Sequence, residues 1–396
     1  MKSTVYIAVV VCLLASCTSV KKVLNAGSLT EKNFNEKTPF EFDKRVPVIA
    51  VTIAGKTYRF LFDTGAPTVL SAELAAALKL QVLTNSKTSD SQGHGKKEQV
   101  VVIPDMQIGG LHFKNTGALV VDTKKVFEMR CMQFDGIIGA NQMAKAVWQL
   151  DYDKKEITVS NSMAAFTITD STPIINFIPA SAQQTPRVPV KIGDKTIYIT
   201  FDTGGSGDLR LSQKNYASQV AGFKSVISTG STGTGIYGGS NTVINQYVKL
   251  PSFSIGDIQL TNQVVEFSDG GSSYVGNEFF KHYKVILNWQ QRKIYMLKQS
   301  DFNAASLSRF AIGIKYINNK PTITELFTNS EAAKAGLLLN DIIVTINGKD
   351  VTRLTEAETC HYAFNSILKD KETTDVTVLR NDKKINCTLK KVVLLD

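Results

Sequence analysis

Two stretches of the chain, YRFLFDTGAPTVLS at 58–71 and YITFDTGGSGDLRLS at 198–212, carry the same short motif. The motif is Asp63-Thr64-Gly65 in the first stretch and Asp202-Thr203-Gly204 in the second. Each triplet follows an apolar run rich in aromatic and β-branched residues, a composition typical of a buried strand. We therefore expect two strands that each carry one carboxylate at the carboxyl end.

The similarity between the two stretches continues along the chain in the same order. The aligned pairs are KTYRFLFD (56–63) with KTIYITFD (195–202), IGGLHFKNTGALVVD (108–122) with IGDIQLTNQVVEFSD (255–269), GIIGANQM (136–143) with YVGNEFF (274–280), and VWQLDYDKKEITV (147–159) with KVILNWQQRKIYM (284–296). Both halves show short alternating strands broken by Gly, Asn and Asp. The sequence therefore indicates an internal duplication, with one β-rich lobe at 41–165 and an equivalent lobe at 166–300.

Two carboxylates held at hydrogen-bond distance can hydrolyse a peptide bond. They cannot both ionise when they are so close, so the pair shares one proton. The ionised carboxylate takes a proton from a water molecule while the protonated one polarises the scissile carbonyl. The glycine of each triplet lets backbone and water approach because it lacks a Cβ, and the two threonines can hydrogen-bond across a pseudo-two-fold axis. We expect Asp63 and Asp202 to form such a pair.

Residues 40–299 resemble the aspartic peptidases of the retropepsin and pepsin types. The triplets match the catalytic loops of that family, and Ile137-Ile138-Gly139 and Tyr274-Val275-Gly276 match the element that braces each loop. The resemblance implies a mainly β fold of two pseudo-symmetric acid-protease β-barrel lobes with a cleft for an extended peptide. It assigns catalysis to Asp63 and Asp202, with the other triplet residues supporting them. Retroviral relatives build the cleft from two chains; here one chain holds both lobes, so we expect a monomer.

The residues after the triplets depart from the pepsin pattern. Pepsins usually have Ser or Thr there, whose hydroxyl can hydrogen-bond a catalytic carboxylate, whereas this chain has Ala66 and Gly205. Fewer hydrogen bonds to the ionised form leave the acidic pKa of the pair less depressed. We therefore predict a rate optimum in mild acid rather than in strong acid.

The family closes its cleft with flap hairpins that follow the catalytic loops. The candidates are SQGHGKKEQ (91–99), which contains His94, and TGSTGTGIYGGS (229–240), which contains Tyr237. A Gly-rich run could instead cradle a phosphate, but no G-x-x-x-x-G-K-[ST] pattern accompanies it. We therefore interpret both segments as substrate flaps.

Residues 306–396 have a different pattern, which predicts a compact α+β domain. The segment NSEAAKAGLLLNDIIVTINGKDV (329–351) resembles PDZ domains of bacterial proteases, apart from Asn340, where many relatives have Gly. The amphipathic segment 354–371 predicts the longer helix of this domain. The fold class expected for the whole chain is thus two β-barrel lobes followed by an α+β PDZ domain.

The PDZ resemblance implies that an extended C-terminus or an internal strand binds by β-augmentation. Within RFAIGI (309–314), it assigns the backbone amides of Ile312, Gly313 and Ile314 as donors to a peptide carboxylate. A domain that merely packs against the lobes is the alternative, since fold does not determine function.

The first residues, MKSTVYIAVVVCLLASC (1–17), have the pattern of an export signal. They resemble a bacterial lipoprotein signal, which implies removal of 1–16, acylation of Cys17 and a lipid anchor in the membrane. The polar segment 17–40 then serves as a tether. An ordinary signal peptide is the alternative. Both interpretations predict a protein of the bacterial cell envelope, and the lipid-anchored form would face the periplasm or the exterior.

Other chemistries have little support in the sequence. The four histidines lack metal-ligand spacing, so we expect no metal and no cofactor. The net charge of +10 comes from dispersed Lys and Arg, which argues against nucleic-acid binding. Cys360 and Cys387 could pair in an oxidising compartment or remain two separate core thiols.

Two functional hypotheses remain. The first is an aspartic endopeptidase whose polypeptide substrates are recruited by the PDZ domain, and the second is an envelope protein that binds peptides in a catalytically silent cleft. Both triplets are complete, and a silent cleft has no chemical need for them. The sequence therefore favours the enzyme.

Overall fold

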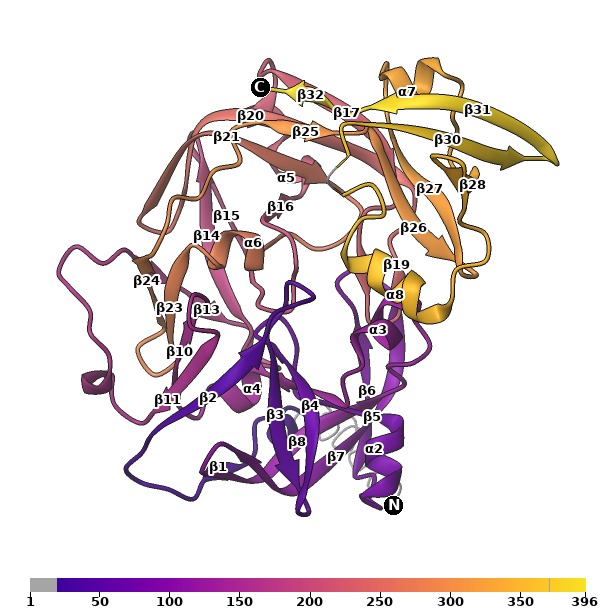
Figure 1. Cartoon of the computed structure of the whole chain (residues 1–396). Coiled ribbons are helices and arrows are strands. Elements are labelled where there is room, and N and C mark those ends of the chain that lie inside the picture. The colour runs from indigo at the N-terminus through magenta and orange to yellow at the C-terminus, as the bar shows by residue number, and fades with distance from the viewer. Residues whose placement is uncertain (1–19, 370) are drawn as a thin grey trace, which may run out of the picture.

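The computed structural model describes residues 20–369 and 371–396 and is mainly β, which confirms the predicted fold class. Figure 1 shows lobe 1 at the bottom, lobe 2 above it and the C-terminal domain beside lobe 2. The predicted signal peptide at 1–16 and the lipidation site Cys17 lie outside the described residues. Within the described ranges, every helix is too short or too polar to span a bilayer.

Lobe 1 is built mostly from antiparallel strands. Its elements are β1 (Ser28–Leu29), β2 (Asn35–Glu41), β3 (Val48–Ile53), β4 (Lys56–Asp63), β5 (Val69–Ser71), α2 (Ala72–Ala77), β6 (Thr84–Ser89), β7 (Gly95–Ile108), β8 (Leu111–Val121), α3 (Phe127–Met132), β9 (Gly136–Gly139), α4 (Ala140–Met143), β10 (Val147–Asp151) and β11 (Glu156–Ser160). Helix α2 begins at Ser71, whose side chain accepts a 3.1 Å hydrogen bond from the Leu74 amide. It therefore starts directly after the strand that follows the first triplet. Strands β1 and β2 come from the segment predicted as a tether, but they pair with β8, β11 and β3 and so belong to the folded lobe.

Lobe 2 repeats this arrangement. Its elements are β12 (Ile174–Asn176), β13 (Ile178–Pro179), β14 (Pro186–Ile192), β15 (Lys195–Phe201), β16 (Leu209–Leu211), α5 (Gln213–Val220), β17 (Ser225–Gly230), β18 (Thr234–Gly235), β19 (Gly238–Gly239), β20 (Val243–Ile255), β21 (Ile258–Ser268), β22 (Tyr274–Val275), α6 (Asn277–Phe280), β23 (Tyr283–Asn288) and β24 (Lys293–Lys298). The parallel pair β15 and β22 corresponds to β4 and β9, and β16 with β21 corresponds to β5 with β8. The duplication in sequence is therefore also a duplication in topology.

The two lobes share one sheet and one core. Strands β12, β24, β23, β10, β11 and β2 are neighbours in that order, and β10 pairs with β23 from Val147↔Asn288 to Asp151↔Lys284. A single hydrophobic cluster includes Phe62 of lobe 1 and Phe201 of lobe 2, both fully buried. Because burial of apolar area is the main stabilising contribution, the lobes are held at a fixed mutual position.

The C-terminal domain comprises a curved sheet and two helices. Its elements are β25 (Leu307–Arg309), β26 (Ile312–Ile317), β27 (Lys320–Phe327), α7 (Glu331–Lys334), β28 (Ile342–Ile346), β29 (Lys349–Asp350), α8 (Glu356–Phe364), β30 (Thr373–Arg380), β31 (Lys383–Lys390) and β32 (Val392–Leu395). Helix α8 begins with a capping box between Thr355 and Glu358. The prediction of a helix over 354–371 was too long: Asn365 is already extended, and the Ser366 hydroxyl accepts from the Leu368 amide, a local bond that competes with the helix.

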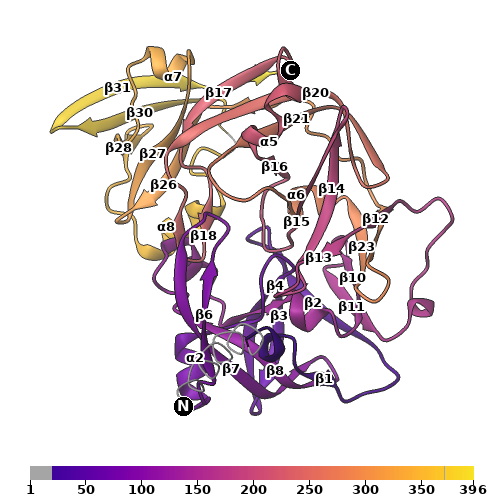
Figure 2. The same ribbon diagram turned by 180° about the vertical axis from the view of Figure 1, so that it is seen from behind.

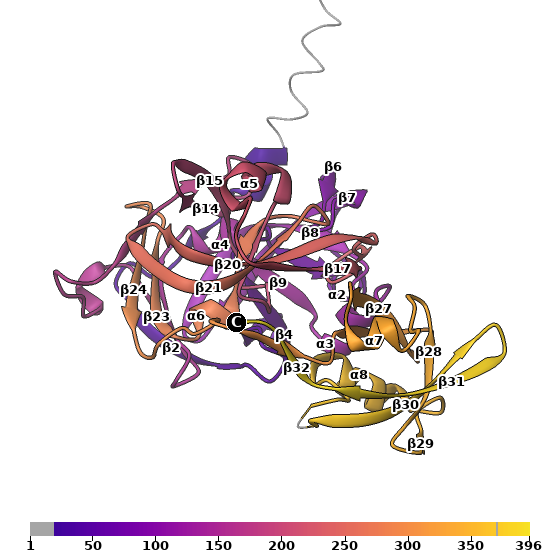
Figure 3. The ribbon, with the colours of Figure 1, turned by 90° about the horizontal axis from the view of Figure 1, so that it is seen from above.

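This domain is joined to lobe 2 by a continuous sheet. Strand β27 pairs antiparallel with β17, in the register Ser228↔Phe327 to Gly230↔Glu325. Tyr247 of lobe 2 packs into the hydrophobic cluster of the C-terminal domain. The views from behind and from above show this domain against one side of the lobes, with the β30–β31 hairpin pointing away from them (Figures 2 and 3).

A disulfide bond joins the same domain to lobe 1. It links Cys131 in α3 to Cys360 in α8, residues separated by 229 positions, with their Cα atoms 5.1 Å apart. Cys387 pairs with no described cysteine. Both alternatives for Cys360 in the sequence analysis were therefore wrong, because the partner comes from a lobe that is distant in sequence and lies beside α8 only in the folded chain.

Candidate active site

Each triplet lies at the end of a strand that a second strand braces. Strand β4 ends at Asp63, which lies opposite Gly139 in the parallel strand β9. In lobe 2, Asp202 lies beside the strand β22 in the same way, and its amide donates to the Val275 carbonyl at 2.9 Å. The hydrophobic-hydrophobic-Gly elements therefore lie directly beside the two catalytic-loop candidates.

The threonines of the triplets hold the two loops together. The Thr64 amide donates to the Thr203 hydroxyl at 3.0 Å, and the Thr203 amide donates to the Thr64 hydroxyl at 3.0 Å. Each hydroxyl in turn donates to a carbonyl of the opposite lobe, at Phe201 and Phe62. Both threonines are fully buried. Since buried polar groups cost free energy when unpaired, this reciprocal set fixes the relative position of the loops.

The carboxyl groups of Asp63 and Asp202 meet at this junction: the point where a Cβ on Gly65 would lie is 3.1 Å from Asp63 Oδ1 and 2.7 Å from Asp202 Oδ1. The Gly65 amide donates to Asp63 Oδ1 at 2.7 Å, and the Gly204 amide donates to Asp202 Oδ1 at 2.9 Å. A Cβ on Gly65 would lie 2.7 Å from Asp202 Oδ1, and one on Gly204 would lie 2.4 Å from Asp63 Cγ. Only glycine leaves room for the carboxyl group of the opposite lobe.

Burial dominates the acidity of this pair. Desolvation raises the pKa of Asp63 well above its usual value of 3.8, and the neighbouring Asp202 raises it further. Desolvation also raises the pKa of Asp202, while hydrogen bonds from Asp63 and from backbone amides oppose this rise. The Gly205 amide is among the donors that lower the pKa of Asp202, and the Ala66 amide does the same for Asp63. The pair therefore retains a shared proton above the pH at which a free Asp is ionised.

Comparison with protein families agrees with this geometry. Residues 49–142 match the aspartyl protease family model, and residues 311–390 match the PDZ domain model. The chain contains an aspartyl protease domain and a PDZ domain. The first match covers lobe 1 with Asp63, and lobe 2 adds Asp202 through the duplicated fold. No curated protein matches the chain.

A buried asparagine of the protease lobes was not singled out from the sequence. Asn277 Nδ2 donates to the carbonyls of Thr203 and Gly205 at 2.7 and 2.8 Å, and its Oδ1 accepts from Tyr152 of lobe 1 at 2.7 Å. Asn141 has the corresponding position in lobe 1, where its Oδ1 accepts from the Thr68 amide at 2.7 Å. The signal in the sequence was an Asn shortly after the Gly of both bracing elements. Asn277 thus hydrogen-bonds the second triplet loop directly, whereas Asn141 contacts the segment that follows the first triplet.

The two predicted flaps of the protease lobes meet each other. The Tyr237 amide donates to Asp90 Oδ2 at 3.0 Å, and its hydroxyl lies 2.7 Å from the Thr88 hydroxyl. His94 Nδ1 lies 3.6 Å from the same Asp90 oxygen. The lobe 1 flap also accepts a 2.7 Å hydrogen bond at Ser91 from the Ser272 amide. His94 and Tyr237 are thus brought together at Asp90, and the contacts of Tyr237 join the two predicted flaps.

A cavity of about 820 Å³ lies next to the dyad. Its lining includes Asp202 and Gly204 from the catalytic loops, and Gln92 and Thr234 from the two flaps. A volume of this size matches typical ligand-binding clefts. The cavity therefore lies between Asp202, the two predicted flaps and the PDZ domain.

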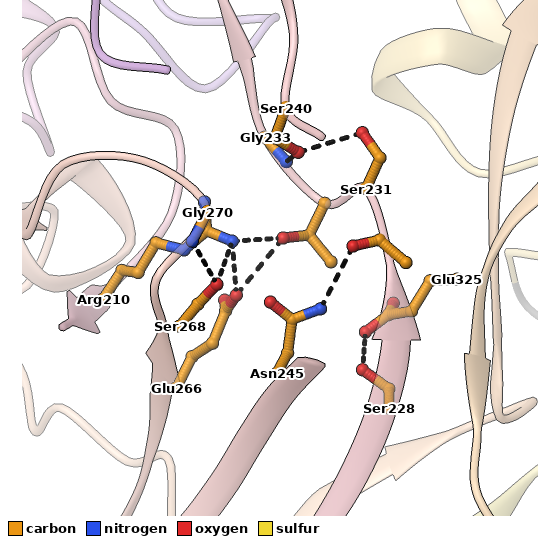
Figure 4. Close-up of polar contacts among 12 residues, drawn as sticks. Arg210, Ser228, Ser231, Gly233, Ser240, Asn245, Glu266, Ser268, Gly270 and Glu325 are labelled. Carbon is orange, nitrogen blue, oxygen red and sulfur yellow. Dashed lines mark hydrogen bonds and ion pairs between the residues drawn. The ribbon is translucent and has the colours of Figure 1, made fainter. Parts of the chain in front are cut away.

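A buried polar network forms the wall of this cavity between the dyad and the PDZ domain (Figure 4). Arg210 is 5% exposed, pairs with Glu266 at 2.9 Å and donates to Thr232 at the base of the lobe 2 flap. Burial raises the pKa of Glu266, and the Arg210 charge opposes that rise. Figure 4 also shows Glu325 of the PDZ domain accepting a 2.7 Å hydrogen bond from Ser228. The Arg210 group thus reaches the lobe 2 flap at Thr232, and the separate bond between Ser228 and Glu325 joins lobe 2 to the PDZ domain.

The predicted carboxylate donors of the PDZ domain line the same cavity. Ile312, Gly313 and Ile314 lie at the start of β26 and contribute to the cavity wall together with Asp202. Among the described residues, no cluster of His, Cys, Asp or Glu could hold a metal ion.

Proposed function

We propose that the protein is an aspartic endopeptidase that hydrolyses peptide bonds with a water molecule activated by Asp63 and Asp202. The observation that carries this proposal is the meeting of the two carboxyl groups, one from each lobe, on loops joined by the Thr64 and Thr203 hydrogen bonds and beside a cavity lined by both predicted flaps. Both groups have a raised pKa because they are buried. One proton shared between them makes the pair an acid and a base at once.

The reaction uses both states of the pair. The ionised carboxylate accepts a proton from the attacking water, whose oxygen forms a bond to the carbonyl carbon. The protonated carboxyl donates to the carbonyl oxygen as negative charge develops there. In the breakdown of the tetrahedral intermediate, the carbon–nitrogen bond breaks and the leaving nitrogen takes a proton from the pair, which returns to its starting state. The threonine bonds between the loops keep the carboxyl groups at this distance throughout.

The flaps and the PDZ domain give the proposed enzyme its substrate class, which is polypeptide. In this proposal an extended chain lies beside Asp202 and the hairpins that carry Gln92 and Thr234, which line the same cavity. The PDZ domain provides a strand edge for a further part of the chain. The N-terminal pattern supports a lipid-anchored enzyme of the bacterial cell envelope, acting in the periplasm or at the exterior.

Turnover of a denatured protein by the purified full chain tests this proposal. We expect cleavage in mild acid, and loss of cleavage in Asp63→Asn and in Asp202→Asn, since either change removes the shared proton and its acceptor. Asp170→Asn, on the exposed connection between the lobes, is the matched control and should keep full activity. Binding of peptides without hydrolysis by the wild type would favour the silent receptor instead, and cleavage that survives both dyad substitutions would exclude the mechanism.

A further inference from the structure

The cavity beside the carboxyl pair continues beyond the protease lobes. Its wall includes Asp202 and Gly204 at one side, and the β26 residues Ile312 to Tyr316 and the α8 residues Tyr362 to Phe364 at the other. Strand β26 and helix α8 form the two sides of the groove in which the PDZ domain would hold a peptide. The groove and the catalytic cleft are therefore parts of one space.

Strand β26 has an edge that can accept a peptide strand. Among the described residues, β26 pairs only with β27, in the register Ile312↔Leu326 to Ile317↔Lys320. The opposite edge borders the cavity, where consecutive residues from Ile312 to Tyr316 line the wall. An extended chain laid along this edge gains backbone hydrogen bonds that do not depend on its sequence.

The end of the groove near Ile312 is basic. Lys369, Lys371 and Lys391 line the cavity there, and Lys371 and Lys391 are only partly exposed. Two of these cations already have carboxylate partners: Arg309, which also lines this end, pairs with Glu325 at 2.9 Å, and Lys391 pairs with the exposed Glu372 at 3.4 Å. A terminal carboxylate is the part of a polypeptide that complements such a cluster, because charge-assisted hydrogen bonds are stronger than neutral ones.

The other end of β26 leads back to the protease flaps. Lys315 Nζ donates to the Gly233 carbonyl at 2.7 Å, and Thr234 of the same flap donates to Glu128 of α3 at 3.3 Å. A chain with its carboxylate near Ile312 must run along β26 toward Tyr316, and it therefore reaches the flap next. The direction of the groove brings residues upstream of the C-terminus toward the dyad.

The connection between groove and dyad is rigid. The sheet pairing of β17 with β27 holds the PDZ domain to lobe 2, and the bond between Cys131 and Cys360 holds it to lobe 1. Arg130 of α3 and Glu356 of α8 add an ion pair at 2.7 Å across the same contact. A PDZ domain on a flexible linker would only concentrate substrate, whereas this one sets a fixed distance between its groove and the cleft.

We infer that the PDZ groove is the C-terminal subsite of the catalytic cleft, so that one molecule holds the free carboxylate of a polypeptide and cuts that chain at a constant number of residues from its C-terminus. This inference rests on the proposed function. It makes the preferred substrates polypeptides with a free C-terminus, and it makes the products short C-terminal fragments of uniform length. Specificity then depends on position from the end as well as on the side chains at the scissile bond.

Pairs of peptides with one sequence, ending either in a free carboxylate or in an amide, test the inference on the full chain. We expect kcat/KM to fall by about tenfold or more on amidation, since the lost charge-assisted hydrogen bonds contribute about 1.5–3 kcal/mol. Mass spectrometry should find the same C-terminal fragment when the peptide is lengthened at its N-terminus. Lengthening at the C-terminus should move the cleaved bond by the number of residues added.

A matched pair of variants locates the effect. Lys391→Ala, in the cavity wall, should reduce the preference for the free carboxylate, whereas Lys390→Ala, exposed on β31, should leave it unchanged. Equal cleavage of free and amidated peptides, at bonds set by sequence alone, would overturn the inference while leaving the endopeptidase intact. If no peptide is cut, the proposed function fails, and fluorescence anisotropy still tests the groove. The labelled peptide with a free carboxylate should bind the full chain at least about tenfold tighter than the same peptide ending in an amide. Equal binding of the two peptides would refute carboxylate recognition by the groove.

Discussion

Removal of the disulfide between lobe 1 and the PDZ domain is predicted to destabilise the chain in a measurable way. Cys360→Ser is the preferred perturbation, because Cys360 is partly exposed whereas Cys131 is buried. The bond closes a loop of 229 residues. In the chain-entropy model a loop of this length contributes roughly 5 kcal/mol, slightly more than a loop of about 100 residues. This is an upper value, since the continuous sheet between lobe 2 and the PDZ domain also restricts the parts.

The thermal midpoint is the quantity to measure. An unfolding entropy of about 2.1 cal/mol/K per residue over 396 residues converts the upper value into a decrease of roughly 6 °C. Wild type in reductant should have the same thermal midpoint as Cys360→Ser. Cys387→Ser should have the same midpoint as untreated wild type, because Cys387 pairs with no described cysteine. Equal midpoints for Cys360→Ser and wild type without reductant would refute the reasoning, as would a decrease in Cys387→Ser.

Three further predictions concern the groups around the dyad. Thr203→Val removes the hydroxyl that accepts from the Thr64 amide and should lower the free energy of unfolding by about 1–3 kcal/mol; urea titration should show that Thr203→Ser restores most of it. Folding raises the pKa of Asp63, so the free energy of unfolding decreases as the pH rises from 3.8 through the pKa of the folded state. Asp63→Asn should therefore have a higher melting temperature than wild type at neutral pH, and the two melting temperatures should converge in acid. Arg210→Met leaves the partly buried Glu266 without its cationic partner and should lower the free energy of unfolding by less than the about 3–5 kcal/mol of a fully buried pair, whereas adding Glu266→Leu should recover much of the loss; no recovery in the double variant would contradict this.

The sequence was informative where local pattern and repetition coincide. The triplets after apolar runs predicted strands that end at Asp63 and Asp202, and in the structure β4 ends at Asp63 while β15 ends directly before Asp202. The duplication predicted equivalent lobes because aligned residues of the two halves have similar local sequences and therefore form the same strands and contacts. The PDZ resemblance is confirmed by the family match at 311–390.

Features that depend on the packing of distant segments were not predicted. The partner of Cys360 is 229 positions away, and no spacing rule identifies it. The pairing of β17 with β27 joins two edges whose sequences show only that each is a strand. The early end of α8 results from local bonds of Asn365 and Ser366 that compete with an otherwise continuous amphipathic pattern.

The pH dependence of kcat/KM tests most directly whether the two carboxyl groups share a catalytic proton. The account predicts a bell-shaped profile with its maximum in mild acid and an upper limb well above 3.8, because burial raises the pKa of both groups. Asp63→Asn should lose activity at every pH, so both limbs of the profile should be absent in this variant. A maximum near about pH 2, as in the strongly acidic dyads, or a single limb that persists in that variant, would contradict the account.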